Sequence, residues 1–216
     1  MRFALLVGSS NYQDGYLIAD GDSITRAFGL APNESWFSRA VSSSTLSDLN
    51  FDSYNSGVDS ATVADMLGNV TTEVDAKYRD SARFIISSTV GNIAILFGGT
   101  NDMYFGADET TTRQRQLNWL AGRRAAGFKT LIGTMLRRNP LDVPVNFETY
   151  RQTNVAFWRA NWQTYCDGLI DWCDDAAALD VTNLTYYQDA VHPTAALALI
   201  MGEDYAAHAI RQVITG

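Results

Sequence analysis

The sequence predicts an α/β fold in which a parallel sheet is covered by helices on both faces. Short apolar runs at residues 17–19, 51–54 and 93–97 each end in glycine or a polar turn, which is typical of buried strands. Longer segments with apolar residues at helical spacing follow them, and this alternation favours parallel strands joined by helices. The chain has 216 residues, 46% of them hydrophobic, and no break in composition, so we expect one domain with a sizeable core.

In the N-terminal half, the first strand ends at Gly21, and a helix is expected to begin near Ser35. The second strand, residues 51–54, ends at an Asn-Ser-Gly turn. Thr62 can cap the next helix, because its hydroxyl can accept a hydrogen bond from a free N–H of the first turn. The apolar positions expected in this helix are Val63, Met66, Leu67, Val70 and Val74.

The C-terminal half continues the alternation. The expected elements are a strand at 93–97, a helix at 110–126, a strand at 128–136, a helix at 147–165, a strand at 169–172 and a closing helix at 194–213. The face of the helix at 110–126 that is expected to meet the core carries Leu117, Leu120, Ala121 and Ala125. Residues 78–91 fit either a helix or an extended segment.

We interpret residues 1–15 as an N-terminal extension of unclear role and residues 16–216 as the single domain. The apolar stretch after Met1 is shorter than the core of a secretory signal, and no run approaches the roughly 18 apolar residues of a membrane span. The 16 basic and 24 acidic residues give a formal net charge of −8, which disfavours nucleic acids and anionic membranes as partners. We therefore expect a soluble chain that binds neither nucleic acids nor membranes, whose compartment and oligomeric state the sequence leaves open.

Cysteine and histidine are scarce, with two of each. Cys166 and Cys173 would lie about 10 Å apart on one helix, too far for a disulfide, whereas a turn at Gly168 would allow a bridge. Two buried thiols are the favoured interpretation. The sequence has no HExxH, paired CxxC, P-loop or GxGxxG pattern, so no metal site and no cofactor are predicted.

Ser23 stands directly after the first strand, at the carboxyl end, where ligands bind in open α/β sheets. A serine hydroxyl is a poor nucleophile unless a base takes its proton. His208 lies in the closing helix, whereas His192 lies in a loop, three residues after Asp189. This spacing can place the carboxylate against the imidazole ring, where it would fix the tautomer and stabilise the imidazolium.

Acyl transfer also needs hydrogen-bond donors for the oxyanion. Gly57 and Asn101 each follow a predicted strand, so they belong to the same edge of the sheet as Ser23. Gly57 can offer its backbone N–H, and Asn101 can offer its side-chain NH₂. Each of these residues is also common in turns or caps, but a nucleophile, a base with its carboxylate and two donors on one edge together favour acyl transfer.

The sequence resembles the SGNH hydrolases, also called the GDSL esterase and lipase family. The matching segments, in the order of that family, are GDSIT at 21–25, NSG at 55–57, GGTND at 98–102 and DAVHP at 189–193. The resemblance implies a three-layer α/β/α sandwich with a parallel, flavodoxin-like five-stranded sheet. It implies Ser23 as nucleophile, His192 as base and Asp189 as orienting acid. It also implies an oxyanion hole formed by the Ser23 N–H, the Gly57 N–H and the Asn101 side chain. The GxSxG elbow of α/β-hydrolases is absent.

Three positions depart from the pattern of that family. Asp20 precedes the Gly-Asp-Ser turn, where an uncharged residue is commoner; this acid either raises the pKa of a nearby group or pairs with an arginine such as Arg26. Ser60 replaces a frequent second glycine after Gly57, and Leu197 replaces a glycine after the His-Pro turn. None of these changes removes a catalytic group, so they bear on substrate preference and not on the class of reaction.

The expected activity is two-step hydrolysis of short-chain acyl esters through an acyl-enzyme, with O-acetyl groups of carbohydrates as a natural target. No segment resembles a long apolar lid, which favours a shallow site. Tyr104 and Phe105 follow Asn101 closely and, with Trp36, are candidates for lining that site. Two alternatives stay open: a thioesterase or lysophospholipase-type lipolytic activity, and a non-catalytic carbohydrate-binding or structural module.

Overall fold

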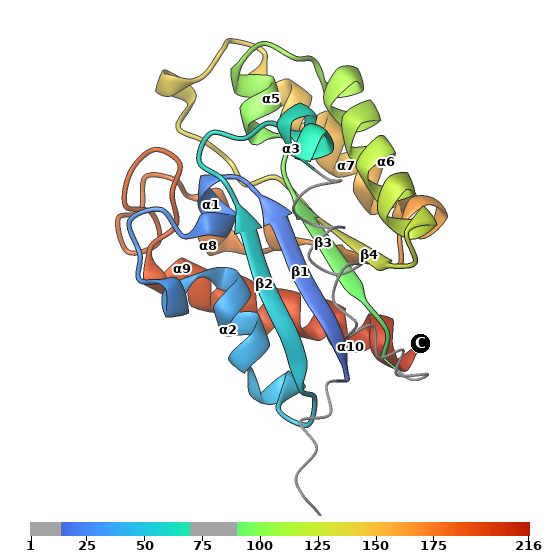
Figure 1. Cartoon of the computed structure of the whole chain (residues 1–216). Helices are drawn as coiled ribbons and strands as arrows, with labels where there is room; N and C mark the ends of the chain where they lie inside the picture. Colours follow the sequence, from blue (N-terminus) through green and yellow to red (C-terminus); the bar gives the residue numbers. More distant parts are fainter. Residues whose placement is uncertain (1–13, 70–89) are drawn as a thin grey trace, which may run out of the picture.

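The computed structural model describes residues 14–69 and 90–216, and it shows one parallel sheet between two layers of helices (Figure 1). The strands are β1 (Gly15–Gly21), β2 (Phe51–Gly57), β3 (Ile93–Phe97), β4 (Lys129–Gly133) and β5 (Gly168–Ile170). Within the described residues their spatial order is β2-β1-β3-β4-β5. This order is the flavodoxin-like one, and the predicted three-layer α/β/α class is confirmed.

The helices follow the strands in alternation. They are α1 (Ser23–Arg26), α2 (Trp36–Ser42), α3 (Val63–Asn69), α5 (Thr100–Tyr104), α6 (Glu109–Ala125), α7 (Phe147–Tyr165), α8 (Ala176–Leu179), α9 (Ala195–Leu199) and α10 (Ala207–Thr215). A π-helical segment, Ile200–Ala206, joins α9 to α10, so the predicted closing helix is continuous but locally widened. Short 3₁₀ turns lie at Pro32–Glu34, Ser44–Leu46, Pro140–Asp142 and Trp172–Asp174.

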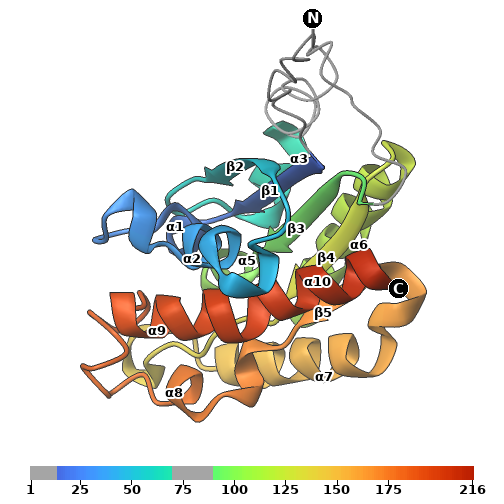
Figure 2. The ribbon, with the colours of Figure 1, turned by 90° about the horizontal axis from the view of Figure 1, so that it is seen from below.

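The strands bury both faces because alternate side chains enter two separate cores. On one face, Leu17 and Ile95 pack with residues of α2, α9 and α10, and α10 lies along β4 and β5 (Figure 2). On the other face, Ile18 and Leu96 pack with residues of α3, α6 and α7. Strands buried on both sides read as continuous apolar runs, which is why 93–97 could be recognised from the sequence.

The strand β2 is longer than predicted. It pairs with β1 residue by residue from Gly15–Phe51 to Gly21–Gly57, so the Asn-Ser-Gly segment continues the strand instead of ending it. The Asn55 side chain also donates to the Thr25 carbonyl at 2.6 Å. A turn-like tripeptide can therefore be extended where a neighbouring strand supplies its hydrogen-bond partners.

The prediction for the buried face of α6 was partly wrong. The buried residues of this helix are Thr112, Gln116, Trp119, Leu120 and Arg123. Leu117 is half-buried, and Ala121 and Ala125 are exposed. Gln116 enters the core because its side chain serves buried polar groups: it donates to the Gly98 carbonyl at 2.8 Å and accepts from the Trp158 indole at 2.9 Å.

Other boundaries differ by a few residues. The strand predicted at 128–136 ends at Gly133, where the sheet ends while the chain stays buried, and the strand predicted at 169–172 is β5. Thr62 caps α3 as predicted, accepting from the Asp65 N–H at 3.2 Å.

Cys166 and Cys173 are both free and buried. The predicted apolar positions Val70 and Val74, and the ambiguous residues 78–89, lie outside the described residues, as do residues 1–13 of the expected extension.

Candidate active site

The predicted site residues gather at the carboxyl ends of the strands. In the order β2-β1-β3, consecutive connections leave β1 and β3 in opposite directions, and this switch point is where open α/β sheets bind ligands. Ser23 follows β1, and Asn101 follows β3, one on each side of the switch point. His192 reaches the same place from the loop that precedes α9.

Ser23 is the first residue of α1 and is 8% exposed. Asp22 caps this short helix, accepting from the Ile24 N–H at 2.9 Å, and thereby fixes the turn that carries the serine. The Ser23 Oγ lies 2.9 Å from Nε2 of His192. The imidazole is therefore within hydrogen-bond reach of the hydroxyl.

Asp189 orients His192 from within the same loop. Its Oδ2 lies 2.8 Å from the ring Nδ1, and its Oδ1 accepts from the backbone N–H groups of Val191 and His192, both at 2.7 Å. A carboxylate only accepts, so Nδ1 carries the proton and Nε2 is free to accept from the serine. Burial opposes ionisation of Asp189, but the hydrogen bonds from His192 and Val191 outweigh it and hold the pKa of this carboxyl below its usual range.

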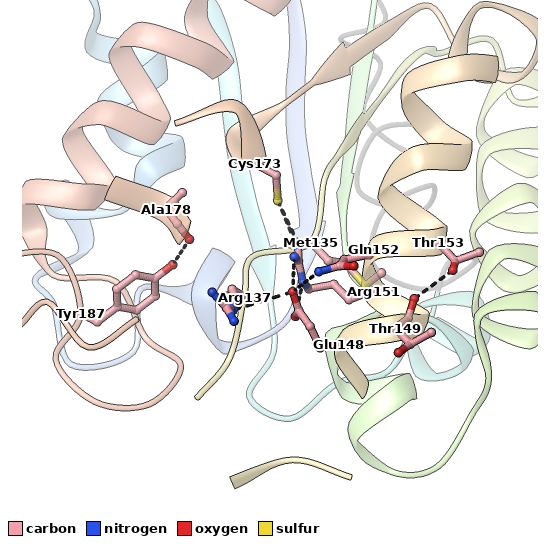
Figure 3. Close-up of polar contacts among 10 residues, drawn as sticks. All are labelled: Met135, Arg137, Glu148, Thr149, Arg151, Gln152, Thr153, Cys173, Ala178 and Tyr187. Carbon is pink, nitrogen blue, oxygen red and sulfur yellow. Dashed lines mark hydrogen bonds and ion pairs between the residues drawn. The ribbon is translucent and has the colours of Figure 1, made fainter. Parts of the chain in front are cut away.

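The loop itself is anchored at both ends. Tyr187 forms an isolated antiparallel β-bridge with Pro193, and the Gln188 N–H donates to the His192 carbonyl at 2.9 Å. The buried Tyr187 hydroxyl donates to the Ala178 carbonyl at 2.7 Å, which ties the loop to α8 (Figure 3). These contacts hold the loop around His192 in one geometry.

Gly57 occupies the predicted place at the end of β2, but its N–H is engaged. It donates to the Asn55 side chain at 3.0 Å. The need for glycine here is steric, because a Cβ would lie 2.3 Å from the Arg26 nitrogen. The structure therefore differs from the expectation that the Gly57 N–H stands free as an oxyanion donor.

Ser60, which stands where the family often has a glycine, has an unusual backbone conformation. Its φ is 61°, a left-handed conformation that serine rarely adopts. In the part of the chain that the structure describes, the Ser60 N–H has no hydrogen-bond partner. The neighbouring Ala61 carbonyl accepts from the Asn101 side chain at 3.0 Å, so the Ser60–Ala61 backbone runs beside that amide. The signal in the sequence was the departure from glycine at this position.

Asn101 lies in α5, is 5% exposed, and uses both ends of its amide. Nδ2 donates to the Ala61 carbonyl, and Oδ1 accepts from Nη2 of Arg138 at 2.7 Å. The NH₂ group has two hydrogens, so one remains for a ligand. The next residue, Asp102, accepts from the Val63 N–H at 2.7 Å and from Arg115 at 2.7 Å, which fixes α5 against α3 and α6.

Arg138, the second of two adjacent arginines after β4, is only 8% exposed. It donates to the Thr100 hydroxyl at 2.8 Å as well as to Asn101, and its guanidinium lies 4.9 Å from the centre of the Tyr104 ring. Burial lowers the pKa of this guanidinium from its usual value, against the charges of Asp22 and Asp189, which raise it. A cation therefore stands directly behind the predicted oxyanion donor.

The segment that leads to Arg138 is fixed to α7. Arg151 donates to both carboxylate oxygens of Glu148 at 2.8 Å and to the Met135 carbonyl at 3.0 Å (Figure 3). The Cys173 thiol donates to the same carbonyl at 2.9 Å. Glu148 also lies 3.7 Å from Arg137, so the chain on either side of the strand end is held in place.

Asp22 brings an unusual charge to the site. Burial raises the pKa of this carboxyl to about 6, although the Ile24 N–H and the charges of Arg138 and His192 lower it. The charge of Asp22 therefore changes near pH 6. Of the two alternatives left open for Asp20, the structure does not show the pairing with Arg26: Asp20 accepts from the Trp119 indole at 2.8 Å, and Arg26 pairs with Asp59 at 2.5 Å.

The predicted aromatic residues lie on two sides of the site. Trp36 is 1% exposed and forms part of the wall of a small pocket beside His192 and Phe28, whose ring centroid is 4.5 Å from the imidazole. Tyr104 and Phe105 are exposed, and Tyr104 lines a shallow groove with residues 141–144. Phe28 was not anticipated, because it lies outside every recognised motif.

Among the described residues, no group of three or more metal-ligating side chains is gathered in one place. The second histidine, His208, is exposed on α10, away from Ser23 in the sequence and in the fold. In the described ranges, no helix combines the length and the apolar character that crossing a membrane requires.

Solved structures with this fold include esterases and lipolytic proteins. A member of the lipolytic protein G-D-S-L family from Veillonella parvula is 19% identical, covering 93% of this chain and 98% of its own, with a TM-score of 0.68. The psychrotrophic esterase EstA from Pseudoalteromonas sp. is 14% identical, covering 94% and 100%, with a TM-score of 0.67. TesA is 19% identical, covering 86% and 93%, with a TM-score of 0.64.

At these identities the likeness to solved structures shows the fold. A search of curated proteins gave no match. The sequence model of the GDSL-like lipase/acylhydrolase family matches residues 19–198, a span that contains the end of β1, the whole of β2 to β5 and each of the four motifs. The chain therefore belongs to the GDSL-like lipase/acylhydrolase family.

Proposed function

We propose that the protein is a serine esterase that hydrolyses short-chain acyl esters through a Ser23–His192–Asp189 triad. The single observation that supports this most strongly is the unbroken chain of hydrogen bonds, 2.9 Å from Ser23 to His192 and 2.8 Å from His192 to Asp189. Two hydrogen bonds in series give the hydroxyl a base and give the base an orienting carboxylate, which is the arrangement that nucleophilic serines require.

In the first step, the Ser23 Oγ forms a bond to the acyl carbon while its proton passes to Nε2 of His192. The carbonyl π electrons move to the oxygen, which becomes the oxyanion. When the tetrahedral intermediate collapses, the bond to the alcohol oxygen breaks, and that oxygen takes the proton from Nε2. Water then repeats the sequence on the acyl-enzyme, releasing the acid and the free serine.

The proposed oxyanion hole consists of the Ser23 N–H, the remaining Nδ2 hydrogen of Asn101 and the Ser60 N–H. Ser60 takes the place predicted for Gly57, because the Gly57 N–H already donates to Asn55. Strained backbone is common where a group must be aimed at a ligand, and the left-handed Ser60 beside the Asn101 amide fits that pattern. Such preorganised donors typically contribute about 10²- to 10³-fold each to kcat.

The pocket beside His192 supports a short acyl group. Its volume open to the centre of a water-sized sphere is about 10 Å³, room for roughly one water or one methyl group. We propose that an acetyl methyl enters this pocket and that the alcohol lies toward the shallow groove at Tyr104. The open groove fits a carbohydrate alcohol, since the exposed ring of Tyr104 can stack on a sugar ring.

A lipolytic or thioesterase activity on longer acyl chains is the second candidate. One observation favours it: exposed large apolar side chains occur in the segments that follow the strands. They are Phe28, Val58, Tyr104, Phe105, Leu141, Val145 and Leu184. Such side chains would suit an apolar substrate that lies outside the small pocket.

The test is hydrolysis of p-nitrophenyl esters from acetate to palmitate, with Ser23→Ala beside the wild type. The proposal predicts the highest kcat/KM at acetate or butyrate and the loss of turnover in the variant, at an unchanged melting temperature. A maximum at long chains would favour the lipolytic candidate. No turnover on any ester would favour a non-catalytic carbohydrate-binding module.

A further inference from the structure

We propose that Arg138 is a positioning residue of the oxyanion hole, which sets the orientation of the Asn101 amide and polarises it. This inference rests on the proposed esterase function, in which Asn101 supplies one oxyanion donor. Arg138 does not belong to any motif that the sequence analysis singled out, and it reaches the site from the segment after β4.

The contacts of Asn101 show why its orientation needs a second residue. Arginine has only donors, so Nη2 of Arg138, at 2.7 Å, must face the amide oxygen. The Ala61 carbonyl only accepts, so it must face the NH₂, at 3.0 Å. In a flipped amide, the NH₂ would face the Arg138 donor and Oδ1 would face the Ala61 carbonyl oxygen, and neither pair could form a hydrogen bond. Arg138 and Ala61 therefore fix which end of Asn101 presents a free hydrogen.

Arg138 is itself held rigidly. Nε donates to the Thr100 hydroxyl at 2.8 Å, and the guanidinium lies over the rings of Tyr104 and Phe147, 4.9 and 5.9 Å from their centroids. Among the described residues it forms no ion pair. Its hydrogen bonds go to neutral oxygens, so its charge is not cancelled by direct contact with a carboxylate.

A charged donor to Oδ1 also makes the NH₂ group of the Asn101 amide a stronger hydrogen-bond donor. Hydrogen bonds to ionised groups are stronger than neutral ones, and bonded groups in a chain polarise one another in a buried environment. The Nδ2 hydrogen that faces the substrate thereby becomes a better donor to a developing negative charge. The effect grows in the transition state, so the loss should appear in kcat more than in KM.

The chain offers a matched control next to this residue. The Arg137 side chain is 42% exposed and lies 3.7 Å from Glu148, with no contact to Asn101. Arg137→Met and Arg138→Met make the same chemical change on adjacent residues. Arg138→Lys keeps a cationic donor but loses the fork that reaches both Thr100 and Asn101.

The first experiment measures p-nitrophenyl acetate kinetics for these variants and for Asn101→Ala. Arg138→Met should lower kcat roughly 10- to 100-fold with KM within about twofold, and Arg138→Lys should recover part of the loss. Arg137→Met should stay within about twofold of the wild type. In the Asn101→Ala background, adding Arg138→Met should lower kcat by less than a further factor of about two, because Arg138 acts through Asn101. Losses that multiply, or an unchanged kcat in Arg138→Met, would overturn the inference.

A second measurement does not depend on turnover. The side-chain NH₂ resonances of Asn101 can be assigned by their absence in Asn101→Ala. In the folded wild type they should exchange slowly with solvent, and Arg138→Met should speed this exchange at least about tenfold, while Arg137→Met should not. Unchanged exchange in Arg138→Met would refute the positioning role even if the esterase were active. Conversely, a wild type that hydrolyses no ester but shows this difference would contradict the proposed function and leave the role of Arg138 supported.

Discussion

At the scale of single residues, two polar side chains of the site are each fixed by more than one hydrogen bond. Asp189 holds the imidazole with one oxygen and its own loop with the other, and Asn101 is held at both ends of its amide. Side chains that are held by two hydrogen bonds present one geometry to a substrate without reorganising, which is the condition for strong stabilisation of a transition state.

Asp22 gives a residue-scale prediction about stability and pH. Its folded pKa of about 6 exceeds the ordinary value of 3.8, so folding becomes less favourable as pH rises through that window, and the cost is complete above it. The two values imply a cost of about 3 kcal/mol. An asparagine at this position would stay neutral and could still cap α1, so the free energy of unfolding of Asp22→Asn, relative to wild type, should rise between pH 4 and pH 7.

Urea denaturation of both proteins at pH 4.5 and pH 7.5 measures this difference. The account predicts a gap that widens toward pH 7.5 and closes toward pH 4.5. A gap of the same size at both values would mean that Asp22 does not titrate in this window.

The gathering of Ser23, Asp189, His192 and Asn101 could be expected from the sequence, because each sits in a short motif directly after a strand or before the closing helix. Arg138 could not, since adjacent arginines after a strand are usually solvated, and only the tertiary structure buries one of them. The hydrogen bond of the Gly57 N–H to the Asn55 side chain could not be expected either, because it depends on how that side chain folds back onto the backbone.

At the scale of elements, α6 shows how buried polar groups override hydrophobic patterning. The fully buried Gln116 donates to the Gly98 carbonyl and accepts from Asn154 and Trp158, both at 2.9 Å. These bonds join β3, α6 and α7 just below the site. A pattern based on apolar spacing assigns this position to the surface, which is why the predicted face of α6 was partly wrong.

Replacing Gln116 by leucine should therefore destabilise the protein strongly. It leaves three buried polar groups without partners, each worth about 1–3 kcal/mol, so the free energy of unfolding should fall by about 3 kcal/mol or more. Gln114→Leu, on the exposed side of the same helix, should change it by less than about 0.5 kcal/mol. Thermal and urea unfolding test this pair, and equal effects would contradict the role assigned to Gln116.

The segment after β2 allows a prediction about backbone strain. Relief of the left-handed conformation of Ser60 is worth about 1–2 kcal/mol, which exceeds the entropic cost of a glycine, about 0.4–1 kcal/mol. Ser60→Gly should thus raise the free energy of unfolding by about 0.5–1 kcal/mol and keep kcat within about twofold, because the N–H remains. Ser47→Gly, at an exposed serine with φ −64°, should instead lower it. A destabilised Ser60→Gly protein would refute the strain.

At the scale of the whole molecule, the fold class follows from the sequence because buried parallel strands and their helices alternate regularly. Each of the five predicted strands lies within a few residues of a strand in the described part of the chain. The sequence did not predict the short helix α8. It also did not predict two features that depend on contacts between distant segments: the pairing that extends β2, and the pocket formed where Phe28 and Trp36 meet the loop of His192. These depend on tertiary packing and leave little local signal.

The size of that pocket gives a prediction for the whole enzyme. Phe28 lies against the His192 ring, and Phe28→Ala would enlarge the pocket, so the ratio of kcat/KM for octanoate to that for acetate should rise about tenfold. Phe105→Ala, which removes an exposed ring outside the pocket, should leave this ratio within about twofold. An unchanged ratio in Phe28→Ala would place the acyl group elsewhere.

The central claim, that Ser23 is a nucleophile activated by His192, is tested most directly by covalent labelling. The wild type is treated with a fluorophosphonate reagent, and the site of modification is read by mass spectrometry of its peptides. The account predicts one phosphonyl group per chain, on the peptide that contains Ser23, with esterase activity falling in proportion and no labelling in Ser23→Ala. An unlabelled wild type, or equal labelling of Ser23→Ala, would contradict it.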